Sequence, residues 1–217
     1  MKNIEIEARS FITSNQYKDL EGRLNKIARF LGKINEETVY CGKESIRIRR
    51  DNNSSWLILK SGKIHDDFRD EIKIQFKRTD FEKLKEIFER LGFNIEVAWF
   101  RKRKIYDWRG IKVFLDDTKG YGKIIELETQ YQSKARCWTS PVPKRSFWYG
   151  EIGKEGEERK IHEKLKEKLK SLGIKITPKK VFEKKFKYYK NNWRKILSTS
   201  AKSYSGSTVA LREGRKI

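Results

Sequence analysis

Charged side chains recur at every second position in several short stretches of this sequence. Residues 4–9 read IEIEAR, so that Glu5, Glu7 and Arg9 alternate with apolar residues, and Arg47 and Arg49 alternate with isoleucine in the same way. Because neighbouring side chains leave a β-strand on opposite faces, each stretch predicts a strand with one apolar and one charged face. One such strand would usually turn its charged face to water. The repetition indicates instead that the charges gather at a common site.

The charged faces carry two kinds of chemistry. Arginine forks bind phosphate oxygens bidentately and lysine adds a point charge, so the basic residues suit a chain of phosphates. Carboxylates, together with phosphate oxygens and water, form the usual shell of Mg²⁺ or Mn²⁺. The residues on these faces are Glu5, Glu7, Arg9, Arg47, Arg49, Lys60, Arg69, Glu71, Lys73, Arg101, Arg103, Asp116, Glu126 and Glu128.

Strand and helix patterns alternate along the first 130 residues. Apolar residues at helical spacing predict helices over residues 14–31 and 80–91, each followed by a glycine. Asp51-Asn52-Asn53-Ser54 is a turn signal between two strand patterns and predicts a hairpin. The predicted strands are 4–9, 38–41, 44–50, 55–60, 68–76, 98–108, 112–116 and 124–129, and two further helices are predicted over 157–172 and 179–196.

These elements predict an α+β fold in which the sheet turns its apolar face outward and its charged face inward. The amphipathic helices can cover the apolar faces of the strands, so the charged faces must point at one another. A closed antiparallel β-barrel satisfies both conditions, with a polar lumen and an apolar exterior on which the helices pack. Such a lumen would be costly when empty, because its charges lose solvation, and it is better explained as a site for a charged ligand.

The order of the charged motifs resembles the CYTH superfamily, the triphosphate tunnel metalloenzymes. The family's opening E-x-E-x-K is matched by Glu5, Glu7 and Arg9, and its R-x-R and lone lysine by Arg47, Arg49 and Lys60. The paired basic strand and the closing D-x-x-x-G-x-G-x-x-x-E-x-E are matched by Arg101, Arg103, Asp116, Gly120, Gly122, Glu126 and Glu128. The resemblance is strong over residues 1–130 and weaker beyond them.

The resemblance implies an eight-stranded antiparallel tunnel whose relatives hydrolyse or cyclise triphosphates with Mg²⁺ or Mn²⁺. They include tripolyphosphatases, thiamine triphosphatases, RNA triphosphatases and class IV adenylate cyclases. It implies metal coordination by Glu5, Glu7, Asp116, Glu126 and Glu128, and catalytic roles for Glu5, Glu7 and Glu71. It implies phosphate binding by Arg9, Arg47, Arg49, Lys60, Arg69, Lys73, Arg101 and Arg103.

Two positions depart from the family pattern. Arg9 replaces the usual lysine, which exchanges a point donor for a fork. Lys73 stands where a second acidic residue often follows Glu71. The lysine counts against a second metal site and makes the interior more basic. Three functions remain open: a metal-dependent triphosphatase, a class IV adenylate cyclase, and a non-catalytic binder of polyphosphate or RNA.

The net charge of +22 is concentrated in the back of the chain. Residues 1–130 carry a net charge of +6 and residues 131–217 carry +16. The stretch Lys179–Lys195 interleaves lysines and aromatics, which suits RNA, although Phe182, Phe186, Tyr189 and Trp193 lie at helical spacing and favour a helix docked on the barrel.

Several function classes are excluded by the sequence. It has no C-x-x-C zinc spacing, no P-loop and no apolar run of the roughly 20 residues that span a bilayer. Charges begin at Lys2 and Glu5, so no signal peptide is expected. We expect a cytoplasmic monomer or homodimer whose partner is a triphosphate compound and not a membrane. One domain is predicted over residues 1–197, with a core at 1–130, an irregular insertion at 132–156, helices at 157–197 and a disordered tail at 198–217.

Overall fold

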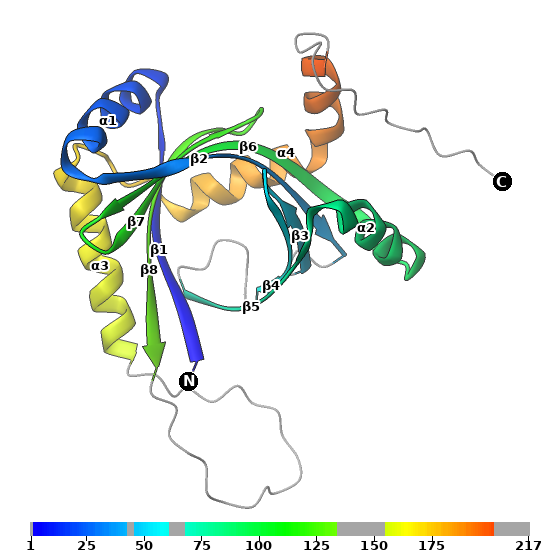
Figure 1. Ribbon diagram of the computed structural model, residues 1–217. Coiled ribbons are helices and arrows are strands. Elements are labelled where there is room, and N and C mark those ends of the chain that lie inside the picture. Colours follow the sequence, from blue (N-terminus) through cyan, green and yellow to red (C-terminus); the bar gives the residue numbers. More distant parts are fainter. Residues whose placement is uncertain (1, 43–45, 61–67, 134–154, 202–217) are drawn as a thin grey trace, which may run out of the picture.

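The computed structural model describes residues 2–42, 46–60, 68–133 and 155–201, of which residues 2, 3, 68–70, 132, 133, 155, 200 and 201 are described by their backbone alone (Figure 1). The strands are β1 (Lys2–Ile12), β2 (Arg29–Cys41), β3 (Ile46–Arg50), β4 (Ser54–Lys60), β5 (Phe68–Lys77), β6 (Ile95–Trp108), β7 (Ile111–Thr118) and β8 (Gly122–Ser133). The helices are α1 (Ser14–Ile27), α2 (Phe81–Arg90), α3 (Glu155–Ser171) and α4 (Lys179–Ala201), and a 3₁₀ turn (Arg78–Asp80) precedes α2. None of the described helices is both long and apolar enough to cross a membrane.

All eight strands belong to one antiparallel sheet, which confirms the predicted α+β class and strand arrangement. The order of neighbours is β1-β5-β4-β3-β2-β6-β7-β8, and β8 pairs with β1 in turn. Within the described residues the two pairings of β1 differ in length: β1 pairs with β8 from Lys2 to Ile12, and with β5 from Ile4 to Ile6. Because this β1–β5 seam is short, the sheet has the form of a curled half-barrel in Figure 1. The predicted closed barrel is thus confirmed as far as a curled half-barrel.

Helices cover most of the convex face of the sheet. Leu20 and Leu24 of α1 and Leu165 and Leu169 of α3 join one buried cluster with the outward side chains of β1, β7 and β8. Phe81 of α2 covers β2 and β3 in a second cluster. Helix α4 packs on the concave side instead, where Phe182, Phe186 and Tyr189 join a third cluster with residues that include Tyr40 and Tyr121. The prediction that this helix docks on the sheet is confirmed, but it docks at one end of the interior and not on the outside.

The expectation that every apolar face is covered is wrong for β4 and β5. Ile72 and Ile74 of β5 are 62% and 59% exposed, and Leu59 of β4 is 41% exposed. The alternation in this part of the chain does predict the strand and its two faces. It does not tell whether a helix reaches the apolar one, because that depends on where the connecting segments run.

The boundary between α1 and β2 lies earlier than the sequence predicted. The helix predicted over residues 14–31 ends at Ile27, because Ala28 is extended at φ −134° and ψ 153°. From Arg29 onward β2 pairs with β6. Long-range pairing overrides the helical pattern here, since Leu31 is 42% exposed and lacks a buried partner that would hold it in a helix.

The C-terminal predictions are only partly within the described residues. Helix α4 continues to Ala201 and so takes in the first four residues of the predicted disordered tail, which corrects that boundary. The rest of the tail, and residues 134–154 of the predicted insertion, lie outside the described residues. Helices α3 and α4 confirm the two helices predicted in this region.

A glycine at the β7–β8 turn provides a test of how α4 is seated. Gly120 has φ +71°, and a methyl group at this position would overlap the side chain of Ile196 in α4. Gly110 has a similar φ of +83°, but an added methyl would meet nothing within 4 Å. We expect Gly120→Ala to lower the free energy of unfolding by about 2 kcal/mol more than Gly110→Ala, because only the first adds overpacking to backbone strain. Equal losses in urea unfolding would show that α4 does not rest on Gly120.

Candidate functional site

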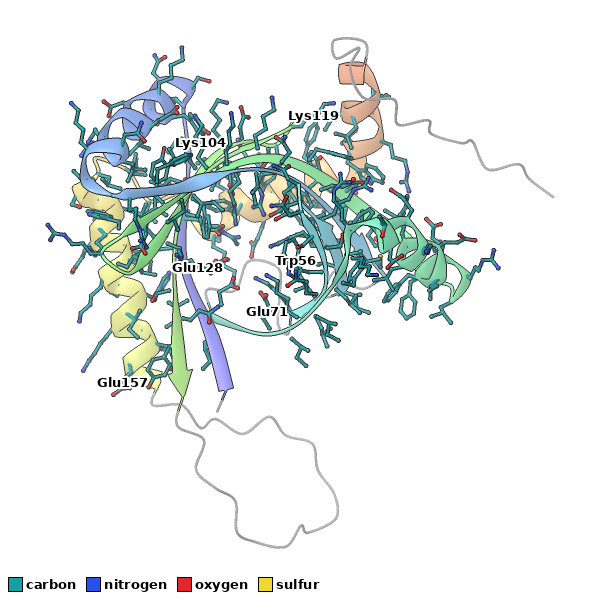
Figure 2. All side chains as sticks on the ribbon, in the orientation of Figure 1. Trp56, Glu71, Lys104, Lys119, Glu128 and Glu157 are labelled. Carbon is teal, nitrogen blue, oxygen red and sulfur yellow. The ribbon has the colours of Figure 1, made fainter. Side chains whose placement is uncertain are left out.

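The concave face of the sheet surrounds a cavity of about 320 Å³. The predicted site residues whose side chains are described all line it: Glu5, Glu7, Arg9, Arg47, Arg49, Lys60, Glu71, Lys73, Arg101, Arg103, Asp116, Glu126 and Glu128. In Figure 2, Glu71, Glu128 and Trp56 lie on this concave side. The side chain of Arg69 lies outside the described residues, although its backbone stands opposite Glu5. The cavity is called the lumen below, and the roles of these residues remain predictions.

The lumen carries nearly equal numbers of opposite charges. Among the described residues that line it, seven are basic and eight are acidic. The acidic set includes Glu36 and Asp51, which the sequence analysis did not assign. Counted by residue type, the described walls of the lumen are therefore nearly balanced in charge.

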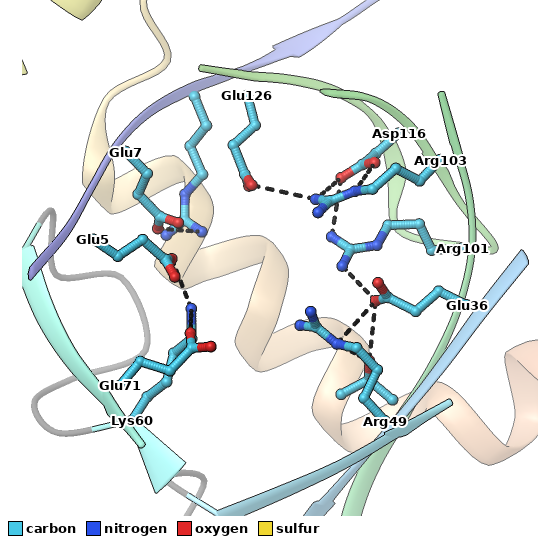
Figure 3. A network of polar contacts seen from close by, with 12 residues as sticks. Glu5, Glu7, Glu36, Arg49, Lys60, Glu71, Arg101, Arg103, Asp116 and Glu126 are labelled. Atoms are coloured by element: carbon cyan, nitrogen blue, oxygen red, sulfur yellow. Dashed lines mark hydrogen bonds and ion pairs between the residues drawn. The ribbon is translucent and has the colours of Figure 1, made fainter. Parts of the chain in front are cut away.

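Arg101 and Arg103 of β6 are held by carboxylates on both sides (Figure 3). Arg103 donates from Nε to Asp116 Oδ1 at 2.7 Å and from Nη2 to Asp116 Oδ2 at 2.7 Å, and it reaches Glu126 Oε1 at 3.2 Å. Arg101 donates to Asp116 Oδ2 at 2.9 Å and to Glu36. Asp116, only 1% exposed, is thus the common acceptor that fixes both guanidinium groups.

Glu36 of β2 completes this network from the other side. It is 5% exposed, and besides Arg101 it contacts Arg49 Nε at 3.5 Å and accepts from Thr38 Oγ1 at 3.1 Å. Burial opposes its ionisation, but Arg101 and Arg49 outweigh this and lower its pKa below the ordinary value. Glu36 is therefore an ionised carboxylate that neutralises two of the predicted phosphate-binding arginines.

Lys60 joins two carboxylates on the opposite wall. Its Nζ lies 2.7 Å from Glu5 Oε1 and 2.9 Å from Glu71 Oε2. Burial raises the pKa of Glu5 to about 7 despite Lys60, whereas Lys60 outweighs burial and lowers the pKa of Glu71 to about 2. Since the two carboxylates share one ammonium and titrate together, the group is close to a protonation change at neutral pH.

The carboxylates of β1 and β8 lie next to each other across a strand pair. Glu7 stands directly opposite Glu128, and Arg9 opposite Glu126. Burial, with the charges of Glu5 and Glu126, raises the pKa of Glu128 to about 8. As the side chains stand, no three His, Cys, Asp or Glu residues in the described part of the chain converge on a metal position. The electrostatics nevertheless favour a cation beside Glu128, because burial and the charges of Glu5 and Glu126 outweigh the neighbouring basic groups there.

One end of the lumen is aromatic, which the sequence analysis missed. Tyr40, Trp99 and Tyr121 line it together with Phe182 and Phe186 of α4, which crosses behind the charged residues in Figure 3. The alternation Ile34, Glu36, Thr38, Tyr40 could have revealed part of this wall. This alternation was not recognised as a strand because the preceding helix was predicted to continue to residue 31, whereas α1 ends at Ile27.

The two raised pKa values predict how stability depends on pH. A carboxylate whose pKa is higher in the folded chain contributes stability that is complete below its ordinary value near 4.5 and is lost as pH rises through the folded value. Glu36 and Glu71 have lowered pKa values, so their contributions are lost only below the ordinary value. Between pH 5.5 and 8.5 we therefore expect the melting temperature in EDTA to fall as Glu5 and Glu128 ionise.

The variant Glu128→Gln isolates the cause of this pH dependence. It removes one of the two titrating groups while keeping its size, so its melting temperature in EDTA should fall less over the same pH interval. Groups that do not interact with Glu128 cancel in the difference, and the loss of the Glu128 charge also eases the ionisation of Glu5, which acts in the same direction. Parallel curves for the two proteins would contradict the assignment of this instability to Glu128.

The curled antiparallel sheet, the helices on its convex face and a concave lumen lined by opposite charges define the class of fold. The protein family described as "CYTH domain" matches this chain over residues 3–137, which is more than half of its length. The chain belongs to the CYTH domain family.

A relative and two solved structures add to this comparison. The Methanocaldococcus jannaschii protein named "Putative adenylate cyclase" is 37% identical over 86 residues, which are 39% of this chain and 49% of the relative. The chain thus spans about half the length of the curated relative that it matches.

A Pyrococcus horikoshii structure has a TM-score of 0.59 at 24% identity, with 81% of this chain and 93% of that chain covered. A structure of the Hippeastrum "Putative adenylyl cyclase", which is described with a dominant triphosphatase activity, has a TM-score of 0.51 at 17% identity, with coverages of 79% and 88%. At these identities the likeness shows the fold alone.

Proposed function

We propose that this chain is a divalent-cation-dependent hydrolase of triphosphate compounds, which it binds inside the curled sheet closed as a tunnel. The observation that carries the proposal is the single lumen that combines carboxylates on β1 and β8 with arginines and a lysine on β3, β4 and β6. Membership of the CYTH domain family supports it. The triphosphatase activity described for the Hippeastrum protein is consistent with it.

The charge balance of the lumen explains why a cation is needed. Eight acidic residues offset seven basic ones, so a triphosphate would gain little from the walls alone. Mg²⁺ is usually held by one or two carboxylates together with substrate phosphates, and it needs no complete protein cage. The residues present fit this description, with Glu5, Glu7, Glu126 and Glu128 available to hold Mg²⁺ or Mn²⁺ as the substrate arrives.

In this proposal the basic residues grip the phosphates. Arg47, Arg49, Lys60, Arg101 and Arg103 would contact their oxygens, with Arg9 and the half-exposed rim residue Lys73 adding charge at either side. Arg101 and Arg103 are already oriented by Asp116 and Glu36, so little side-chain entropy is lost when phosphate binds. We therefore give Asp116 a positioning role in place of the metal coordination that the resemblance implied.

In the proposed reaction water attacks a phosphorus atom, the bond from that phosphorus to its bridging oxygen breaks, and the rest of the phosphate chain leaves with that oxygen. The cation supplies neutralisation of the phosphate charge. Glu5, with its pKa raised to about 7, is suited to accept a proton from the attacking water, and Glu7 and Glu71 would orient it and Lys60.

Cyclisation of ATP is the second candidate. It is favoured by one observation, the 37% identity over 86 residues to a protein named as an adenylate cyclase. The same lumen would then hold ATP so that its own ribose hydroxyl, and not water, attacks the α-phosphorus. A non-catalytic polyphosphate binder is the third, since Lys73 replaces a carboxylate in the motif that resembles the family's.

One assay separates the three candidates. The protein is incubated with tripolyphosphate, ATP or thiamine triphosphate, each with Mg²⁺, with Mn²⁺ and with EDTA, and free phosphate, pyrophosphate and cyclic AMP are measured. Cation-dependent phosphate release supports the hydrolase and names its substrate. Cyclic AMP with pyrophosphate would replace it by the cyclase, and binding without turnover would replace it by the binder.

A further inference from the structure

We propose that the outward face of α4 binds single-stranded RNA. The inward face of this helix is fully used for packing, with Phe182, Phe186 and Tyr189 buried and Trp193 partly buried against the sheet. Trp193 Nε1 also donates to Glu96 O at 3.0 Å, and Tyr189 Oη donates to Ala98 O at 2.9 Å. The helix is thus fixed in place, and its opposite face is presented as a rigid surface.

That opposite face is basic along most of its length. Lys180, Lys184, Lys187 and Lys195 are all exposed and lie within one side of the helix, since residues three, four and seven positions apart share a face. Successive lysines four residues apart are separated by about 6 Å along the axis. Over its whole length α4 has eight lysine and arginine residues and a single acidic one, Glu183. Such a row of cations is complementary to a chain of phosphates.

The lysines are available for a ligand. Within the described part of the chain, Lys180, Lys184 and Lys187 form no ion pair, whereas Lys190 nearby is paired with Glu96 at 3.0 Å. A binding phosphate would therefore displace no internal partner from these three lysines. Their concentration also leaves mutual repulsion that a polyanion would relieve.

An aromatic ring lies in the middle of the basic face. Tyr188 is 65% exposed, and it lines a shallow groove with Lys180, Val181, Lys184 and Lys185. An exposed ring beside cations is the arrangement that holds unpaired bases, because every base offers a π-face for stacking while its phosphate meets the charge. The ring takes no part in the cluster that packs α4 on the sheet.

These features favour single-stranded RNA over other polyanions. A membrane-binding helix inserts its apolar stripe between lipids, but the apolar stripe of α4 is already packed on the sheet. An acidic protein would use the lysines without the exposed ring. RNA that is single-stranded offers both phosphates and unstacked bases. The inference is independent of the lumen, because the face concerned lies opposite Phe182 and Phe186, so its failure would leave the proposed hydrolysis intact.

The test uses the full chain and a short fluorescent oligouridylate, with dissociation constants measured by anisotropy over a series of KCl concentrations. The variant replaces Lys180, Lys184 and Lys187 by glutamine. The matched control replaces Lys160, Lys164 and Lys170 of α3, which are exposed in the same way and remove the same charge. We expect the α4 variant to bind about tenfold more weakly and to lower the slope of log K against log salt by about 2, while the control changes little.

A second variant examines stacking. Tyr188→Ala should weaken binding about fivefold without changing the salt slope, because it removes a ring and no charge. Equal losses in the α4 and α3 lysine variants would overturn the proposal, since binding would then follow net charge alone. Tighter binding to vesicles that contain phosphatidylserine than to oligouridylate would also overturn it. All substituted side chains are exposed, and an unchanged melting temperature confirms that each variant is folded.

Discussion

Replacing Glu126 by glutamine is expected to lower triphosphate turnover by at least about a hundredfold while the fold is preserved. Glu126 is 7% exposed in the lumen, and its Oε1 accepts from Arg103 at 3.2 Å. The amide oxygen of glutamine can still accept this hydrogen bond, so the arginine network should remain in place. The charge that would hold the cation against the phosphates is lost, which weakens stabilisation of the transition state and not the fold.

The measurement is kcat/KM for the best substrate at saturating Mg²⁺ or Mn²⁺, with melting temperatures recorded in parallel. Glu163→Gln is the matched control, because Glu163 is an exposed residue of α3 that pairs with Lys166 far from the lumen. The control should keep full turnover. If Glu126→Gln also kept full turnover, the assignment of the catalytic cation to β1 and β8 would be wrong.

Glu36→Ala is expected to destabilise the fold more than any other single change in a carboxylate of β2. The substitution leaves Arg49 and Arg101 without the acceptor that neutralises them, and both guanidinium groups are largely buried, with side chains 19% exposed. Breaking a buried ion pair by removing one partner costs about 3 kcal/mol or more, because a charge is left without compensation. Asp116 still holds Arg101, and so it limits the loss.

The neighbouring residue provides the control for this prediction. Glu37 points to the opposite face of β2, where its side chain is 17% exposed against 3% for Glu36 and pairs with Arg50 at 2.5 Å. Arg50 keeps a second partner in Glu82 when Glu37 is removed. Glu37→Ala should therefore cost about 1 kcal/mol or less. Urea unfolding of both variants measures the difference. Added tripolyphosphate should raise the melting temperature of Glu36→Ala more than that of Glu37→Ala, because a phosphate can replace the missing carboxylate beside the arginines.

Much of the fold could be predicted because its strands alternate so regularly. Glu5 and Glu7, Arg47 and Arg49, and Arg101 and Arg103 each mark the concave side of a strand, and the period of two places such pairs correctly without any knowledge of the neighbours. The ends of strands were less predictable. Ala28 and Arg29 continue a helical pattern in the sequence, and only pairing with β6 makes them extended.

Part of the candidate site could not be predicted for the same reason. Glu36 follows the misplaced helix end, so its alternation with Ile34 and Thr38 was not recognised as a strand face. The aromatic end of the lumen depends on α4, whose residues Phe182 and Phe186 come from a distant part of the chain. Helical spacing identified their buried stripe, but it gives no information on which surface the stripe covers.

The position of α4 has a consequence for how ligands enter and leave the lumen. With Phe182 and Phe186 of this helix lining one end of the lumen, a polyphosphate would enter and leave by the other end. If the proposed hydrolysis takes place there, a long polyphosphate would not slide through the lumen from one cut to the next. A ladder of intermediate lengths would then accumulate before the shortest products.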